Sequence, residues 1–358
     1  MSSHFHKIFQ GHDEMSVRYD AKQEAIWTYF KPSGRPCFSP ALLKESKSIQ
    51  KSIIGYFQNG GKKPYPVRYI VMASQTPGVF NLGGDLNLFI KLIAEQRRDL
   101  LLEYATACID ICYPNSVALD LPITTITLVE GSALGGGMES AMSSNVLIAE
   151  EHAQMGVPEI RFNLFPGMGA YSFIARKVGA KTAQEMLQKG EVYSAREMYN
   201  LKIVDVLADK GKGYEAVDEY IRKHKRIANG MRAIEKVKQF YDPVTYEELM
   251  GITRIWVDAA FQLSDKDIRV MQRLVKAQNR SIDPHDGEGK NHVLRTKQNR
   301  RFAQHNVSFP LLDSSGQTIP LDRRKTERRN GDHWQFADKA QDIDDLKARK
   351  GQHIGDSI

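Results

Sequence analysis

Two glutamates whose positions favour acid–base chemistry stand beside turns marked by glycine or proline. Glu139 follows Gly135-Gly136-Gly137-Met138, and Glu159, twenty positions further along, follows Pro158. Two carboxyl groups placed around one substrate can act as general acid and general base, which typically contributes about 10²–10⁴-fold in rate. The spacing leaves a second interpretation open, in which Glu139 only interacts with its helix dipole and Glu159 is an ordinary loop acid.

Two glycine turns could supply main-chain amides to the same site. Residues 67–73 and 123–129 predict buried strands, and each strand leads through consecutive glycines to the start of a helix. Amides at a helix start lack partners and carry partial positive charge. We therefore expect the N–H groups of Gly84 and Gly136 to form an oxyanion hole. The alternative is that these glycines only permit close packing between strand and helix.

Several other kinds of active site are excluded by the motifs. There is no Gly-x-Ser-x-Gly nucleophile elbow, and residues 131–136 lack the dinucleotide fingerprint because Ala133 stands where its second glycine should fall. The Gly-Gly-Lys-Lys run at 60–63 lacks the other residues of a phosphate-binding loop. No Cys/His cluster has zinc spacing. The sequence therefore predicts neither a metal site nor a cofactor.

The composition limits the compartment and the partners. The 358 residues exceed the usual size of one domain, and 41% apolar with 26% charged residues allow a large core. A net charge of +7 and a pI near 9.1 fit an anionic partner such as a phosphate, an acidic carrier protein or nucleic acid, or simply a soluble basic protein. Three cysteines cannot form a disulfide framework, residues 1–16 lack the apolar core of a signal peptide, and no apolar run approaches a bilayer span. We therefore expect a cytoplasmic protein.

Strand and helix patterns alternate along the chain and position these turns. Residues 17–30 predict one or two strands, and Ser39-Pro40 caps a helix that ends near Gln58. One long amphipathic helix is expected from Leu86 to about Ile111. Further strands are expected at 145–149 and 203–207, and further helices at 170–179, 180–189 and from 214 onward. Alternating strands and helices followed by helices alone indicate an α/β core with a helical C-terminal part.

The same patterns divide the chain into four regions. We predict a flexible N-terminus at 1–16, an α/β core at 17–210, a helical region at 211–280 and a mostly disordered polar tail at 281–358. The run Arg323-Arg324-Lys325-Thr326-Glu327-Arg328-Arg329 in the tail could bind nucleic acid or an acidic surface. The pattern favours a solvated charged tail instead, because no aromatic residue interleaves the run to stack on bases.

The motifs around the two glutamates resemble the crotonase (enoyl-CoA hydratase/isomerase) superfamily over about residues 67–207. The central signature is the run from Gly131 to Glu139, followed at the expected distances by Pro158-Glu159 and Pro166-Gly167-Met168-Gly169. The resemblance implies a crotonase-like spiral of ββα units, assembled as a homo-oligomer of three or six subunits. It also implies an oxyanion hole and two proton-transferring glutamates, which fall on Gly84, Gly136, Glu139 and Glu159.

A narrower resemblance, over about residues 17–280, is to the branch that synthesises diffusible signal factors, the cis-2-unsaturated fatty-acid signals of some bacteria. Four segments carry it, namely 34–39 (GRPCFS), 80–86 (FNLGGDL), 165–173 (FPGMGAYSF) and 255–258 (IWVD). The branch implies a 3-hydroxyacyl thioester on acyl carrier protein as substrate, dehydration to the cis-2-enoyl thioester, and hydrolysis to the free acid. It also implies a regulatory partner, the receiver domain of a membrane sensor kinase.

Five apolar side chains are expected to line the channel for the acyl chain: Leu88, Met138, Met142, Met155 and Trp256. The same residue types also suit a plain core, because Met and Leu fill gaps in any interior. Two rival functions stay open. The first is a β-oxidation hydratase that acts on CoA thioesters, and the second is a non-catalytic protein whose arginine-rich tail binds nucleic acid.

Overall fold

The computed structural model describes residues 3–61 and 65–282. The chain divides into two compact units, Met1–Val293 and Leu294–Ile358, and all the described residues belong to the first. Residues 283–358, which include nearly all of the predicted polar tail and its arginine-rich run, lie outside the described residues.

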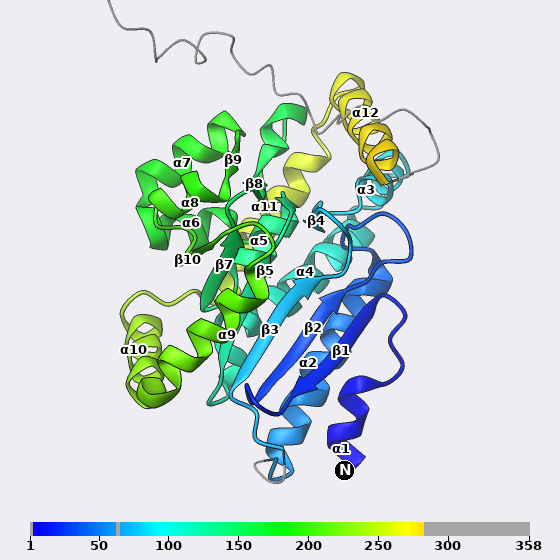
Figure 1. Cartoon of the computed structure of the whole chain (residues 1–358). Helices are drawn as coiled ribbons and strands as arrows, with labels where there is room; N and C mark the ends of the chain where they lie inside the picture. Colours follow the sequence, from blue (N-terminus) through cyan, green and yellow to red (C-terminus); the bar gives the residue numbers. More distant parts are fainter. Residues whose placement is uncertain (1–2, 62–64, 283–358) are drawn as a thin grey trace, which may run out of the picture. The chain divides into compact units, whose positions relative to one another are not determined.

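Two β-sheets form the centre of the first unit (Figure 1). The larger sheet contains β1 (Met15–Asp20), β2 (Ala25–Phe30), β3 (Tyr69–Ser74), β5 (Thr124–Val129), β7 (Val146–Glu150) and β10 (Val206–Ala208), in that order. The smaller sheet contains β4 (Val79–Asn81), β6 (Ser132–Leu134), β8 (Gln154–Gly156) and β9 (Val192–Ser194), in that order. Neighbouring strands run parallel except in the pairs β1–β2 and β8–β9.

Helices cover both faces of the larger sheet, and β2 shows the consequence for the sequence. Because successive side chains of a strand point to opposite faces, Ile26 packs in one cluster and Trp27 in another. The first cluster includes side chains of α2 (Pro40–Gln58) and α4 (Arg98–Ser116), and the second includes side chains of α9 (Gly213–His224). Every residue of β2 is buried, so this strand reads as a continuous apolar run rather than an alternation.

The chain passes from the larger to the smaller sheet three times in the same way. Strands β3, β5 and β7 are followed by β4, β6 and β8, and these lead into α3 (Leu86–Ala94), α5 (Gly136–Met142) and the short 3-10 helix η3 (Pro158–Phe162). This repetition confirms the α/β fold with its spiral of ββα units. Since β4, β6 and β8 are parallel neighbours, their carboxyl ends lie at one edge of the smaller sheet, and the segments that follow them meet there.

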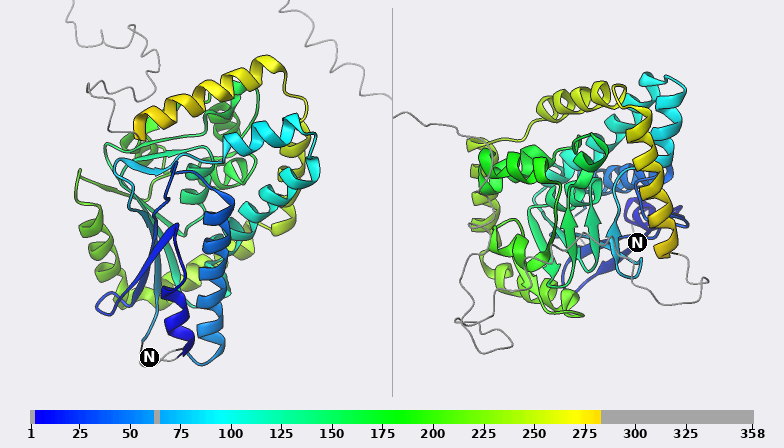
Figure 2. Two further views of the ribbon diagram at one scale, coloured as in Figure 1. Left: turned by 90° about the vertical axis from the view of Figure 1, so that its right-hand side faces the viewer. Right: turned by 90° about the horizontal axis from the view of Figure 1, so that it is seen from above.

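The remaining helices complete the first unit, and those after residue 211 form the helical C-terminal part that the sequence predicted. They are α1 (Ser3–His6), η1 (Lys7–Phe9), η2 (Ala118–Asp120), α6 (Ala170–Val178), α7 (Ala180–Lys189), α8 (Ala195–Asn200), η4 (Lys225–Ile227), α10 (Ala228–Tyr241), α11 (Tyr246–Ala260) and α12 (Asp265–Ile282). Figure 2 shows α12 in yellow beside α3 in cyan, and α12 also contacts η3. Among the helices of the described residues, none is long and apolar enough to cross a membrane.

Two sequence predictions differ from the structure. The helix expected from Leu86 to Ile111 is two helices, because Gln96 has a φ of 53° and ends the first one. In the N-terminal segment a helix begins at Ser3, Phe5 and Ile8 are buried in the core, and the strand begins at Met15 instead of Val17. Phe5, Ile8 and Phe9 follow one another at a spacing of three to four positions from Phe5, which fits one buried face of a helical start.

Candidate active site

Glu139 lies in the first turn of α5 and is almost completely buried. Its Oε1 accepts hydrogen bonds from the N–H groups of Met168, at 2.8 Å, and Ala170, at 3.0 Å. These two amides belong to the turn that leads into α6. The turn requires glycine at 167, where a Cβ would lie 2.2 Å from the Trp256 ring, and at 169, where φ is 119°. The Pro-Gly-Met-Gly motif therefore brings two N–H donors to one buried carboxylate.

Glu159 lies in η3, directly after β8, and faces the start of α5. A Cβ placed on Gly135 would lie 2.4 Å from Oε1 of Glu159, so the carboxyl group packs against the bare backbone of Gly135. The φ of Gly135 is 55°, which also favours glycine. The second oxygen of Glu159, Oε2, is buried and has no hydrogen-bond partner among the described residues. A buried oxygen without a partner is uncommon in folded proteins and marks a position that a ligand can satisfy.

The two carboxyl groups hold protons more strongly than exposed acids do. Burial raises the pKa of Glu139 to about 7, even though the Ala170 and Met168 amides favour its charged form. Burial, together with the nearby charge of Glu139, raises the pKa of Glu159 to about 8. Because the two acids interact, these values belong to the pair, and the pair holds about one proton near neutral pH. One carboxyl group can then donate a proton while the other accepts one.

The glycine turn after β4 lies against the start of α5. A Cβ placed on Gly83 would lie 2.8 Å from the nitrogen of Gly136, and a Cβ placed on Gly136 would lie 3.5 Å from the nitrogen of Gly84. The φ of Gly83 is 92°. A side chain at Gly83 would separate the two segments, whereas a Cβ at Gly136 would make ordinary contact, so it is glycine at 83 that permits the main-chain amides to approach one another.

The planes of two peptide bonds fix where the N–H groups of Gly84 and Gly136 point. The oxygen of Gly83 accepts from Phe38 N at 2.8 Å, and in a trans peptide the N–H of Gly84 points to the opposite side. The oxygen of Gly135 accepts from Glu139 N at 3.1 Å, so the N–H of Gly136 points away from the helix. In the turns, loops and caps of the described residues, neither N–H donates to a protein acceptor. Both are available to an oxygen that gains negative charge.

Comparison with known proteins agrees with this geometry. The enoyl-CoA hydratase/isomerase family model matches residues 61–251, more than half of the 358 residues. The chain belongs to this family. The enoyl-CoA hydratase of Bacillus halodurans has the same fold, with a TM-score of 0.58 and 16% identity over 73% of this chain and 100% of that chain.

Two relatives carry hydratase names. The Arabidopsis thaliana protein named "Probable enoyl-CoA hydratase 2, mitochondrial" is 30% identical over 58% of this chain and 65% of its own length. The methylglutaconyl-CoA hydratase of mouse mitochondria is 26% identical over 57% of this chain and 61% of its own length. The matched part of the chain thus spans less than two thirds of either relative.

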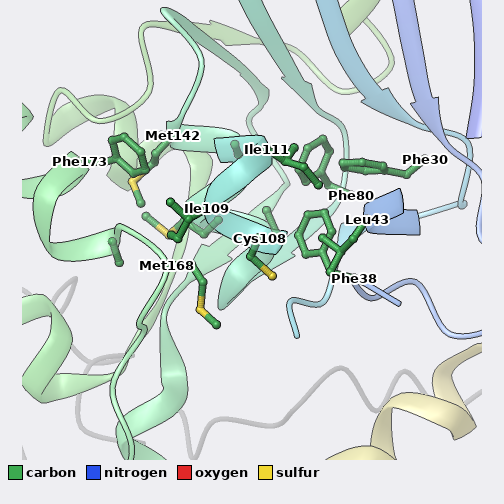
Figure 3. Packing of buried hydrophobic residues seen from close by; sticks show 14 of the residues in the cluster. Phe30, Phe38, Leu43, Phe80, Cys108, Ile109, Ile111, Met142, Met168 and Phe173 are labelled. Atoms are coloured by element: carbon green, nitrogen blue, oxygen red, sulfur yellow. The ribbon is translucent and has the colours of Figure 1, made fainter. Parts of the chain in front are cut away.

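In this member of the enoyl-CoA hydratase/isomerase family, the five residues predicted to line an acyl channel lie in or against the hydrophobic core. Met138 and Met155 are fully buried, and Met142 lies beside Phe173 (Figure 3). Trp256 meets Phe89 edge-on at 5.2 Å between ring centroids, and Leu88 is half-buried. These positions agree with plain core packing, and the channel stays a prediction.

Sequence reasoning missed several residues that shape the site. Asn81 is buried at the end of β4, and its Oδ1 accepts from Gly83 N at 2.7 Å, which holds the glycine turn. Tyr104 reaches the same turn from α4. The Met168 and Ala170 amides hold Glu139. A tyrosine on the apolar face of a predicted helix was the one available signal, because a buried hydroxyl group needs a partner.

Proposed function

We propose that this chain catalyses the loss or addition of water across C2 and C3 of an acyl thioester. Glu139 and Glu159 act as the acid–base pair, and the N–H groups of Gly84 and Gly136 hold the thioester oxygen. The observation that carries the proposal is the meeting of two buried carboxyl groups of raised pKa with two outward-pointing amides at one edge of the smaller sheet.

In the direction of water loss, the thioester carbonyl accepts hydrogen bonds from both amides, which stabilise the negative charge that develops on its oxygen. The ionised glutamate takes the proton from C2. The electron pair forms the C2–C3 double bond as the 3-hydroxyl group leaves with a proton from the protonated glutamate. The pair begins and ends with one proton. Removing one amide donor from such a site typically costs about 2.7–4 kcal/mol of transition-state stabilisation.

The finer proposal is that the substrate is a 3-hydroxyacyl group on acyl carrier protein and that the product is a free cis-2-unsaturated fatty-acid signal. Its support is the position of the segments that resemble the signal-synthesising branch. Segment 34–39 pairs with the glycine turn through Leu82 N to Pro36 O at 2.7 Å, segment 165–173 holds Glu139, and Trp256 packs on Gly167. These distinguishing residues surround the site rather than lying scattered over the fold.

Release of a free acid needs a second step in the same site. The ionised glutamate takes a proton from a water molecule, and the water oxygen attacks the thioester carbon while the two amides hold the oxyanion. The C–S bond then breaks, and the thiol of the carrier leaves with the proton that the glutamate took. The proposal places this reaction in the cytoplasm, with the acyl chain running along Leu88, Met138, Met142, Met155 and Trp256.

The second candidate is a hydratase that acts on CoA thioesters, which the names of the two relatives favour. One assay separates the candidates: purified protein receives a 3-hydroxyacyl carrier protein or a trans-2-enoyl-CoA, and mass spectrometry identifies the products. Free cis-2-enoic acid from the carrier protein supports the finer proposal. Rapid hydration of the CoA ester without free acid supports the hydratase. If neither thioester reacts, the general proposal is wrong.

The cellular form of the assay uses bacteria that express the chain. Their lipids should contain free cis-2-unsaturated acid with the wild-type chain and none with Glu139→Ala or Glu159→Ala. Full product from both variants would contradict the assignment of the acid pair. Binding of a purified receiver domain from a sensor kinase tests the regulatory partner that the resemblance implies.

We also propose that copies of this chain assemble through α10. In the described unit this helix buries none of its residues, and its apolar side chains face outward, with Phe240 91% exposed. Its polar side faces the body instead: Arg232 Nη1 donates to Pro122 O and Gln239 Nε2 donates to Ser116 O. An apolar stripe of this kind marks a surface that another protein covers. The exposed members are Ile234, Val237, Phe240 and Tyr241 of α10, together with Ile227 at the end of the preceding η4.

Light scattering on purified protein tests this assembly. We expect a trimer or hexamer for the wild type and a smaller species for Ile234→Glu with Val237→Glu. Lys236→Glu, on the polar side of the same helix, is the control and should keep the wild-type mass. A monomeric wild type would overturn the proposal.

A further inference from the structure

The hydroxyl group of Tyr104 joins three separate segments beside the candidate oxyanion hole. Tyr104 lies on α4 and is 6% exposed. Its hydroxyl group donates to Phe38 O at 2.6 Å and accepts from Asp85 N at 3.2 Å. The segment that contains Phe38 pairs with Gly84 in an isolated parallel bridge. One buried hydroxyl group thus connects a helix, a loop and the glycine turn.

We infer that Tyr104 is a positioning residue that fixes the direction of the Gly84 N–H in the oxyanion hole. This inference rests on the proposed function, since it concerns the same site. Gly84 has a peptide bond on each side, and each is held at one atom: Gly83 O accepts from Phe38 N at 2.8 Å, and Asp85 N donates to Tyr104. A glycine has unusual backbone freedom, so its N–H keeps one direction only when both neighbouring peptides are held.

The other side chains at the turn hold different atoms. The Asp85 side chain is tied to Arg35 at 2.5 Å and accepts from Leu88 N at 3.3 Å, so it anchors the start of α3 rather than the Gly84 peptide. The Phe89 ring closes the Cα side of Gly84, where a Cβ would lie 2.5 Å from its Cζ, and this ring packs edge-on against Tyr104 at 5.2 Å. Tyr104 therefore supports the turn through both its ring and its hydroxyl group.

The second amide of the hole has a different support. Gly136 is the first residue of α5, and the preceding Gly135 N donates to Gly156 O at 2.8 Å, so this amide is held by a helix start and by β8. Burial raises the pKa of the Tyr104 hydroxyl group well above its ordinary value, which keeps the hydroxyl protonated across the pH range of an assay. Loss of this hydroxyl group is expected to loosen one of the two amides and leave the other in place.

The test is Tyr104→Phe, which removes one oxygen atom and keeps the ring. We expect kcat for the thioester reaction to fall about tenfold with KM within about twofold, because the amide acts on charge that develops in the transition state. The matched control is Tyr56→Phe. Tyr56 also donates to a main-chain carbonyl, that of Tyr65 at 2.7 Å, but in the aromatic cluster around Phe5. The control should lose similar stability and keep kcat.

A spectroscopic probe separates positioning from general loss of structure. The absorption of a 2,4-hexadienoyl thioester, on CoA and on acyl carrier protein, moves to longer wavelength when hydrogen bonds polarise its carbonyl group. We expect a clear shift with wild type and Tyr56→Phe and a smaller shift with Tyr104→Phe. Tyr104→Met serves in its place if the phenylalanine variant does not fold.

The outcomes distinguish this inference from the proposed function. Equal shifts and equal kcat in wild type and Tyr104→Phe would overturn the role of Tyr104 and leave the acid pair intact. Binding without any shift in the wild type, on either carrier, would overturn the oxyanion hole itself. A reduced shift with reduced kcat in Tyr104→Phe alone supports the inference, whichever carrier proves to be the substrate.

Discussion

Glu139 and Glu159 share one site, but the regions that hold them differ. Glu139 sits on a helix, is buried, and receives two main-chain N–H donors from the turn before α6. Glu159 sits in a short 3-10 helix, keeps one buried oxygen that has no partner within residues 3–61 and 65–282, and depends on the bare backbone of Gly135 for space. The comparison teaches that one acid is fixed by hydrogen bonds and the other by the shape of the space around it.

Changing the acids themselves should give the largest effect. Glu139→Gln and Glu159→Gln should each lower kcat by about 10²–10⁴-fold, and the double variant should be little worse than either, because the pair acts as a unit. The stabilities should separate the two regions. Glu139→Leu leaves the Met168 and Ala170 amides without an acceptor and should lower the melting temperature, whereas Glu159→Leu removes no such pair of bonds and should not. Equal melting temperatures for the two variants would mean that hydrogen bonds do not hold Glu139 more firmly than Glu159.

Gly135→Ala should displace the carboxyl group of Glu159, because the added methyl group would fill the space that this carboxyl group occupies. The added Cβ would meet Oε1 of Glu159, so we expect kcat to fall by about 10²-fold as the carboxyl group is displaced. Gly179→Ala is the matched control, since Gly179 also has a positive φ, of 86°, but a Cβ there meets nothing within 4 Å. The control should cost stability and leave kcat unchanged. If both variants lose activity equally, backbone strain rather than Glu159 is responsible.

The shared proton predicts how the rate depends on pH. With pKa values raised to about 7 and about 8, the pair holds two protons in acid and none in alkali, so kcat should fall on both sides of this range. The assay should extend about one pH unit beyond each of these two pKa values. A rate that stays constant over that whole range would contradict the shared proton. In Glu159→Gln the remaining activity should lose the bell shape.

The smallest expected effect is on stability. Because both pKa values lie above the ordinary 4.5, the folded chain binds more protons than the unfolded chain between about pH 4.5 and 8. The free energy of unfolding should therefore fall as pH rises through this window. Denaturant titrations of Glu159→Gln should show a shallower dependence. An unchanged slope would mean that Glu159 is ionised in the folded state.

The sequence predicted the features that depend on local residue types. Buried strands, the Ser39 cap, whose Oγ accepts from Leu42 N at 3.1 Å, and the glycine turns follow from neighbouring residues alone. Strand β2 is an example: every one of its residues is buried, and a short run rich in apolar residues is typical of a strand covered on both faces. The positions of Gly84, Gly136 and the two glutamates on the chain were also visible, although their roles are still proposals.

The smaller sheet could not be predicted, because its strands are only three residues long and have no periodicity of their own. They exist because neighbouring strands supply their hydrogen bonds, which is a tertiary effect. The donors to Glu139, Met168 N and Ala170 N, could not be predicted either. Every residue except proline has a main-chain N–H group, and the sequence does not show which acceptor each one meets in the fold. The break at Gln96 was missed because its positive φ falls within an apolar pattern that continues on both sides.

Infrared difference spectroscopy of the carboxyl groups tests the central claim most directly. Spectra of wild type near neutral pH, with Glu139→Gln and Glu159→Gln as references, report whether a protonated carboxyl group is present in the site. The account predicts a carbonyl band from a protonated glutamate near neutral pH, which weakens in Glu159→Gln because only Glu139 remains, and which is lost when the pH is raised well above about 8. Two fully ionised carboxylates at neutral pH would contradict it.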